Sequence, residues 1–133
     1  MDGMPRGKVT FDTVREIGRA LPEVEDSTAY GSMALKVRGK LLACVPTNKS
    51  AEAGSLMVRI DLEQRAGLLE EAPETYYVTD HYRDYPSVLV RLSKITADEL
   101  RDLLGAAWRF VVADSQKKRR PARGKAVRTR RPG

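Results

Sequence analysis

Apolar residues along this chain recur with two different periods, and this pattern constrains the fold more than any other feature of the sequence. Spacings of three and four residues mark one face of a helix, whereas strict alternation marks a strand with one buried face. Helical spacing occurs at residues 11–21, 62–69 and 100–111, and alternation occurs between these segments. The chain therefore predicts an α+β fold in which helices cover one face of an antiparallel sheet.

Capping residues mark the start of each predicted helix. Thr10 is the first N-cap, and its helix is expected to end at Pro22, because the residue before a proline resists helical geometry. Asp61 begins the second helix, and Thr96 with Glu99 forms the capping box of the third. The predicted buried faces are Phe11, Val14, Ile17 and Leu21; then Leu62, Ala66 and Leu69; then Leu100, Leu103, Leu104, Ala107, Trp108 and Val111.

Five strands are predicted, with Gly39 supplying a tight turn between the first two. The acidic stretch 23–28 is turn-prone and is assigned to a connection, and the polar stretch 46–54 to a flexible loop. The predicted strands are 33–38, 40–45, 56–60, 75–79 and 88–92. The element order is then α-β-β-β-α-β-β-α in a single domain, residues 10–113, which follows a flexible lead-in at residues 1–9.

Positive charge is concentrated at the C-terminal end of the sequence. The 133 residues carry a net charge of +6, but residues 114–133 hold nine basic residues and one acidic residue, which gives +8. The remainder has 15 basic and 17 acidic residues and is mildly negative, at −2. Apolar periodicity ends at Asp114, so residues 114–133 are predicted to form a disordered basic tail.

Several short stretches of the sequence are not diagnostic of a family one by one, but their order and spacing together are specific. They are Ala20-Leu21-Pro22, Tyr30-Gly31-Ser32, Leu35-Lys36-Val37-Arg38-Gly39-Lys40, Arg59-Ile60-Asp61, His81-Tyr82-Arg83-Asp84-Tyr85-Pro86, Val88-Leu89-Val90-Arg91-Leu92 and Ala107-Trp108-Arg109. With these stretches the chain resembles the MmcQ/YjbR-like family over residues 11–113. The resemblance implies a compact α+β fold whose β-hairpins project as paired wings, a shape for which such proteins are labelled DNA-binding. It implies no settled reaction and no catalytic residues.

The chain departs from the family pattern at two places. Ser32 stands where proline is usual, and the basic tail is longer and more cationic than the resemblance accounts for. The candidate wings are the hairpin around Gly39 and the loop around Gly54. The role of the tail is therefore not implied by the resemblance.

The favoured hypothesis is a non-enzymatic protein that binds DNA or RNA through phosphate contacts, largely without sequence specificity. Cations that neutralise phosphates release counterions, and the tail contains no aromatic residue on which a base could stack. The alternatives are a merely solubilising tail, and sheet cations that pair with nearby carboxylates. The candidate binding residues are Lys36, Arg38, Lys40, Arg59 and Arg91 on the sheet, and Lys117, Lys118, Arg119, Arg120, Arg123, Lys125, Arg128, Arg130 and Arg131 in the tail.

The loop 80–86 contains the densest group of chemically active side chains. Its candidate ligand-binding residues are His81, Tyr82, Arg83 and Tyr85, next to two aspartates. One histidine with nearby carboxylates is a weak set of metal ligands and a weak candidate for a general base. The loop is instead a candidate site for binding a small acidic metabolite. Turn stabilisation by these residues is the alternative.

Other functional classes are not favoured by the sequence. No apolar run reaches the length of a membrane span, and Cys44 is the sole cysteine, so a cytoplasmic protein with no internal disulfide is expected. Neither a phosphate-binding loop nor a G-x-S-x-G elbow is present, and no cofactor or metal is expected. A protein-interaction adaptor or a homodimer remains an alternative.

Overall fold

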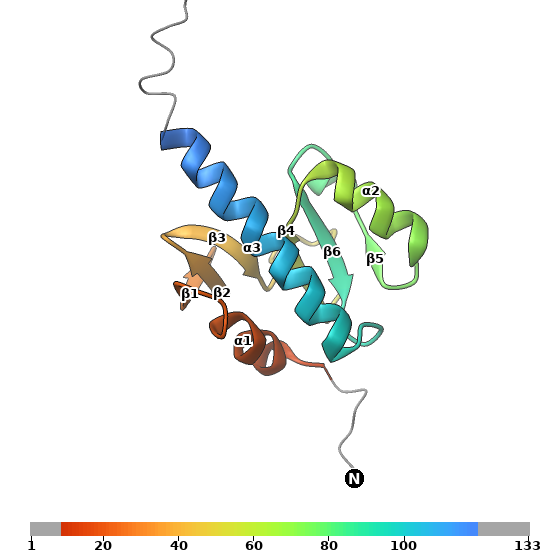
Figure 1. Ribbon diagram of the computed structural model, residues 1–133. Helices are drawn as coiled ribbons and strands as arrows, with labels where there is room; N and C mark the ends of the chain where they lie inside the picture. The colour runs from red at the N-terminus through yellow and green to blue at the C-terminus, as the bar shows by residue number, and fades with distance from the viewer. Residues whose placement is uncertain (1–8, 120–133) are drawn as a thin grey trace, which may run out of the picture.

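The structure is a computed structural model that describes residues 9–119 (Figure 1). The helices are α1 (Phe11–Arg19), α2 (Leu62–Glu71) and α3 (Ala97–Arg119), with a 3-10 turn, η1, at Asp80–Tyr82. The strands are β1 (Val24–Ala29), β2 (Ser32–Val37), β3 (Lys40–Cys44), β4 (Ser55–Arg59), β5 (Tyr76–Tyr77) and β6 (Ser87–Arg91). They form one antiparallel sheet in the order β1-β2-β3-β4-β6-β5, which confirms the predicted α+β class.

The helices begin where the capping residues predict. The Thr10 amide donates to Thr13 Oγ1 at 3.1 Å at the start of α1. At α2, Asp61 Oδ1 accepts from the backbone amide of Gln64 at 2.9 Å. The capping box before α3 is reciprocal, because the Thr96 amide donates to Glu99 Oε1 and the Glu99 amide donates to Thr96 Oγ1. Local sequence therefore determines these three helix starts.

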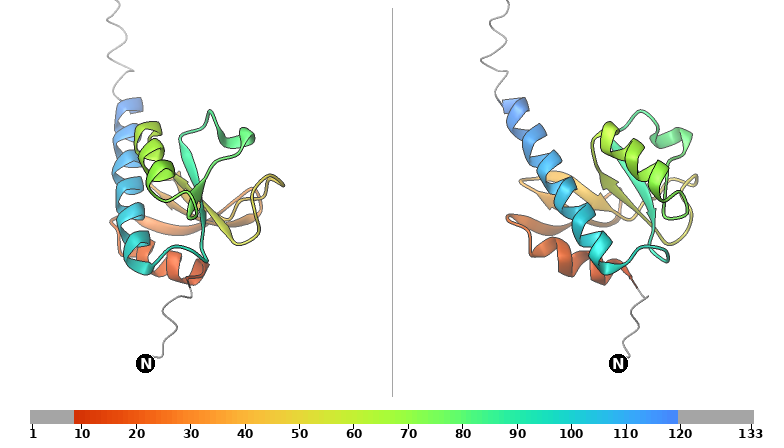
Figure 2. Two further views of the ribbon diagram at one scale, coloured as in Figure 1. Left: turned by 90° about the vertical axis from the view of Figure 1, so that its right-hand side faces the viewer. Right: turned by 45° about the vertical axis from the view of Figure 1, so that its right-hand side comes forward.

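The helices cover one face of the sheet, and the loops around residues 45–54 and 80–86 project on the opposite side (Figure 2). The main core lies under the helices and contains Leu35, Leu56, Val90 and Leu104. A second, smaller cluster lies on the other face, where Ala34, Cys44, Met57 and Leu89 are buried under Tyr77, Tyr82 and Ala51. The central strands are thus buried on both faces, whereas the alternation predicted one solvent face.

The sequence prediction missed strand β1. Its residues, Val24–Ala29, pair with β2 along their whole length, although the stretch was assigned to a turn-prone connection. The acidic composition hid the strand, because β1 is an edge strand whose carboxylates face cations from other elements. Asp26 pairs with Arg15 at 3.0 Å and with Arg19 at 3.5 Å. The turn into β2 uses Tyr30 at φ 54° and Gly31 at φ 79°, a Tyr-Gly pair without the usual Asn-Gly signature.

Two predicted boundaries are also corrected. Val9 is only 8% exposed and packs in the core, so it does not belong to a loose lead-in. Helix α3 continues to Arg119, beyond the predicted end of order at residue 113. A helix that is already nucleated extends readily through Gln, Lys and Arg, and cations are favourable at its C-terminus. Pro121 follows two residues later. The predicted disorder otherwise concerns residues 120–133, which lie outside the described residues.

Helix α2 exists as predicted, but of its predicted buried face only Leu69 packs against the main core. Leu62 is 48% exposed, and no residue of α2 is fully buried. Leu68, Leu69 and Ala72 are the residues that pack against the main core. Trp108, which belongs to the predicted buried face of the third helix, is only partly buried, and its Nε1 donates to the Pro22 carbonyl at 2.9 Å.

Candidate functional site

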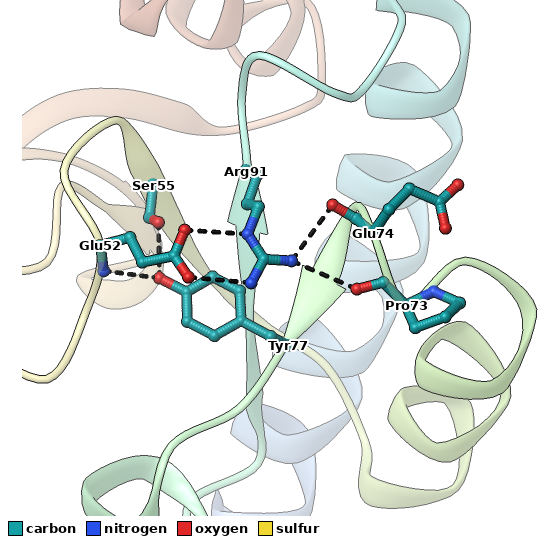
Figure 3. A network of polar contacts seen from close by, with 6 residues as sticks. All are labelled: Glu52, Ser55, Pro73, Glu74, Tyr77 and Arg91. Carbon is teal, nitrogen blue, oxygen red and sulfur yellow. Dashed lines mark hydrogen bonds and ion pairs between the residues drawn. The ribbon is translucent and has the colours of Figure 1, made fainter.

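Arg91, one of the predicted phosphate-binding residues, lies at the centre of an internal polar network (Figure 3). Its Nε and Nη2 donate to the two carboxylate oxygens of Glu52 at 2.9 and 2.8 Å. Its Nη1 donates to the carbonyls of Pro73 and Glu74 at 3.2 and 3.1 Å. The guanidinium also lies over the Tyr77 ring, 4.4 Å from its centroid. Arg91 therefore connects the loop 45–54 to the segment before β5.

The same network includes the hydroxyl of Tyr77. This hydroxyl accepts from the Glu52 amide at 2.7 Å and shares a hydrogen bond with Ser55 Oγ at 2.6 Å. The hydrogen bond and charge of Arg91 lower the pKa of Glu52, and the hydrogen bond to Glu52 raises the pKa of Arg91. Both side chains are charged at neutral pH, and each already has its binding partners within the protein.

The cations of the β2–β3 hairpin lie beside the acidic strand β1. Arg38 Nε donates to Glu23 Oε1 at 2.6 Å, and Lys36 stands opposite Glu25 in the register of the two strands. Lys40, in the adjoining β3, is exposed. Within residues 9–119, no carboxylate lies within ion-pair distance of Lys36 or Lys40. The hairpin thus offers two unpaired cations next to carboxylates, rather than a continuous positive face.

Arg59 lies between two aromatic rings. Its guanidinium carbon is 5.0 Å from the centroid of Tyr85 and 5.3 Å from that of Phe110. Its Nε donates to the Pro86 carbonyl at 3.2 Å. A guanidinium held over aromatic faces is favourable and keeps its charge. Arg59 consequently brings a positive charge to the loop 80–86.

Arg65 of α2 holds the loop 80–86 in place, and sequence reasoning missed this residue. Its guanidinium donates to four carbonyls at 2.8–3.4 Å, those of Tyr82, Arg83, Tyr85 and Ser87. The only sequence signal for this role is a cation among the apolar positions of α2. Arg65 therefore connects four carbonyls in and next to this loop and stabilises the conformation that presents the loop's side chains.

The side chains of the loop 80–86 are arranged mainly for structure. His81 and Tyr82 make an edge-to-face contact with centroids 4.8 Å apart, and Arg83 pairs with Asp80. Tyr82 covers the second core cluster, and burial, together with the nearby Cys44, raises the pKa of its phenol. Among residues 9–119, no group of three or more His, Cys, Asp or Glu side chains is placed to hold a metal ion.

Tyr30 and Tyr85 are both exposed, and Tyr85 lies next to Arg59; we call these two tyrosines the tyrosine surface. Tyr30 is 83% exposed and Tyr85 is 39% exposed. Burial raises the pKa of Tyr85, the Arg59 guanidinium over its ring lowers it, and Tyr30 raises it. The fold thus places Arg59, a predicted phosphate-binding residue, beside the predicted ligand-binding loop 80–86. Tyr30 was missed as a site residue because its exposure follows from the β1–β2 turn.

The remaining predicted site residues lie at or beyond the end of α3. Lys117, Lys118 and Arg119 occupy the last turn of this helix, which runs past the sheet (Figure 1). Arg120, Arg123, Lys125, Arg128, Arg130 and Arg131 lie outside the described residues. In the described part of the chain, no helix combines the length and apolar character of a membrane span.

The comparison with known families agrees with this architecture. The sequence profile of the YjbR family matches residues 19–110. The chain belongs to the YjbR family. This finding confirms the resemblance inferred from the sequence and covers most of the folded part of the protein.

The relatives of this YjbR-family protein share its fold. Uncharacterized proteins Rv2570 of Mycobacterium tuberculosis and Mb2600 of Mycobacterium bovis are each 33% identical to it over 113 residues, which cover 74% of this chain and 85% of theirs. The crystal structure of Deinococcus radiodurans protein DR2400, a DUF419 domain, superimposes with a TM-score of 0.63 at 20% identity. The match covers 79% of this chain and 80% of DR2400. The family and the fold are thus shown, and the function is argued from the site.

Proposed function

We propose that this YjbR-family protein binds nucleic acid without strong sequence preference, through the cations at and beyond the end of α3. One observation carries this proposal. Helix α3 carries Lys117, Lys118 and Arg119 past the sheet, and no Asp or Glu follows Asp114 in the sequence. Cations placed at a distance from the acidic body can reach phosphates, and each neutralised phosphate releases a counterion.

The tyrosine surface supports a secondary contribution from single-stranded bases. Tyr30 and Tyr85 are exposed, and Arg59 adds positive charge beside them. Stacking of a base on an aromatic side chain contributes about 1–3 kcal/mol and tolerates any base. By contrast, Arg38 and Arg91 are paired with carboxylates, so apart from Arg59 the sheet contributes Lys36 and Lys40 at most. The proposal therefore depends on the cations at and beyond the end of α3 more than on the sheet.

Fluorescence anisotropy with a labelled duplex and a labelled single strand, over a series of salt concentrations, tests the proposal. If six cations engage a duplex, log affinity falls against log salt with a slope of about −5. The comparison variant replaces Arg120, Arg123, Lys125, Arg128, Arg130 and Arg131 by glutamine in the full chain. It keeps α3 intact and is expected to lose most of the affinity and of the salt slope. Equal binding by the two proteins would refute the proposal.

A second candidate function is association with a protein, including a second copy of the chain. Tyr30 and Met33, which are 83% and 47% exposed, lie close together in sequence at the β1–β2 turn. Exposed apolar side chains in one place are typical of interaction surfaces. A light-scattering mass above one chain that falls in a Tyr30→Ser variant would favour this function. A monomeric mass at high protein concentration would exclude the homodimer.

A further inference from the structure

A groove of about 920 Å³ lies between α2 and α3, on the helical side of the molecule. Its floor is apolar and includes Ile60, Leu68, Leu103 and Ala106. Its walls carry five carboxylates, which are Glu70, Glu71, Glu74, Glu99 and Asp102. No lysine or arginine lines this groove. An apolar floor with acidic walls fits a cationic peptide that also contains small apolar side chains.

Tyr76 gives a second indication that the groove binds a ligand. This residue is 7% exposed and lines the groove, and its hydroxyl has no hydrogen-bond partner within residues 9–119. The hydroxyl of a largely buried tyrosine usually has a hydrogen-bond partner. Burial, followed by the charges of Glu99, Glu71 and Asp102, raises the pKa of the Tyr76 phenol. The groove thus contains an unused hydrogen-bonding group in a negative potential.

The groove is open because α2 packs loosely beside α3. No residue of α2 is fully buried, and the position where a Cβ on Gly67 would stand has no heavy atom within 4 Å. Arg65 instead ties α2 to the loop 80–86 on its other side. This arrangement leaves room for an extended chain alongside α3.

We propose that this groove binds the basic segment 120–133 of the same chain. The segment contains six Arg and Lys residues and no Asp or Glu, which complements the five carboxylates. Ala126 and Val127 lie between cations in the sequence and suit the apolar floor. The segment is also covalently attached to α3, one wall of the groove.

The geometry allows the segment to return to the groove. Helix α3 rises by 1.5 Å per residue, so about 20 Å separates Ala106 from Arg119. Seven extended residues span roughly 23 Å. Residues 120–126 are therefore long enough to span the distance back to Ala106, and this leaves residues 127–133, with Arg128, Arg130 and Arg131, to occupy the groove.

Because the segment is covalently attached to α3, a weak attraction is sufficient to hold it in the groove. A short tether produces an effective concentration on the order of millimolar, so even a millimolar intrinsic affinity gives substantial occupancy. The same cations are those proposed to contact phosphates, so the groove and a nucleic acid would compete for them. Binding in the groove does not depend on nucleic-acid binding, however, and is tested without any nucleic acid.

Paramagnetic broadening in the full chain tests the proposal directly. A spin label on an Ala126→Cys variant is selective, because Cys44 is only 3% exposed. The amide signals of Gly67, Glu71 and Ala106 are expected to lose intensity at low salt and to recover it at high salt. A mixture of isotope-labelled chain without spin label and spin-labelled chain without isotope label should show no loss. Loss in that mixture would mean that a second copy supplies the segment, and would overturn the proposal.

Matched charge variants complete the experiment. Glu70→Gln, Glu71→Gln and Glu74→Gln together should restore the groove signals, and all three positions are exposed, so folding is preserved. The control replaces three exposed glutamates outside the groove, Glu16, Glu25 and Glu63, by glutamine. The control should retain the loss of signal. Equal behaviour of the two triple variants, or no broadening at the groove, would overturn the proposal.

Discussion

Replacing Arg91 by alanine is expected to destabilise the protein and to release the loop 45–54. The variant loses two hydrogen bonds to the carbonyls of Pro73 and Glu74 and the stacking on Tyr77, and it leaves Glu52 without its partner. At this partly exposed position each hydrogen bond contributes about 0.5–1 kcal/mol. The cation–π contact contributes about 0.5–1 kcal/mol.

Together these losses come to about 2 kcal/mol, before the effect of the ion pair is added. For a domain of this size, this free energy lowers the melting temperature by roughly 8 °C. Urea denaturation followed by circular dichroism measures the free energy of unfolding, and hydrogen exchange at the Glu52 amide measures release of the loop. The amide should exchange faster, because its acceptor, the Tyr77 hydroxyl, is held by the same network.

Arg101→Ala is the matched control, since Arg101 pairs with Asp98 on the exposed surface of α3. An exposed pair of this kind contributes less than about 1 kcal/mol. Acidification gives a second check. Because Arg91 lowers the pKa of Glu52, the stabilisation from this pair is present at neutral pH and is lost as pH falls through the lowered value. If Arg91→Ala costs no more than Arg101→Ala, the network does not anchor the loop.

Three other substitutions or treatments test separate parts of the structure. Gly18→Ala should destabilise by about 1–3 kcal/mol, because its Cβ would overlap the buried Leu35 side chain, whereas Gly67→Ala should be neutral or stabilising in thermal melts. Burial raises the pKa of the Cys44 thiol to about 11, so a thiol reagent at pH 8 should react with it only after denaturation; fast labelling of the native protein would contradict the burial. Tyr30→Ser should weaken binding to a single strand by about 1 kcal/mol or more and leave duplex binding unchanged, as measured by anisotropy.

Short-range features of the sequence account for much of the fold. Thr10, Asp61 and Thr96 mark the three helix starts, and the glycine after Arg38 marks the β2–β3 turn. These features are local, because a capping side chain binds an amide two or three residues away. Strand β1 was not recognisable in the same way. The carboxylate of Asp26 becomes compatible with a strand when Arg15 and Arg19 lie beside it.

The candidate site depended still more on tertiary structure. The alternating sequence pattern predicts that Arg59 and Arg91 lie on one face of their strands. Only the folded structure shows that Arg91 forms an ion pair with Glu52 and that the Arg59 guanidinium lies over the Tyr85 ring. Arg65 was overlooked because its four acceptors are backbone carbonyls, which carry no sequence signature.

The sequence by itself determined the fold class, the helix starts and the separation of a cationic end from a slightly acidic body, because these follow from local spacing and from charge along the chain. Tertiary structure alone decided which cations are available, where the tyrosine surface forms and that five carboxylates gather between α2 and α3. The physical reason is that ion pairs and shared surfaces bring together residues far apart in the chain, such as Glu52 paired with Arg91, or Glu71 and Asp102 lining one groove.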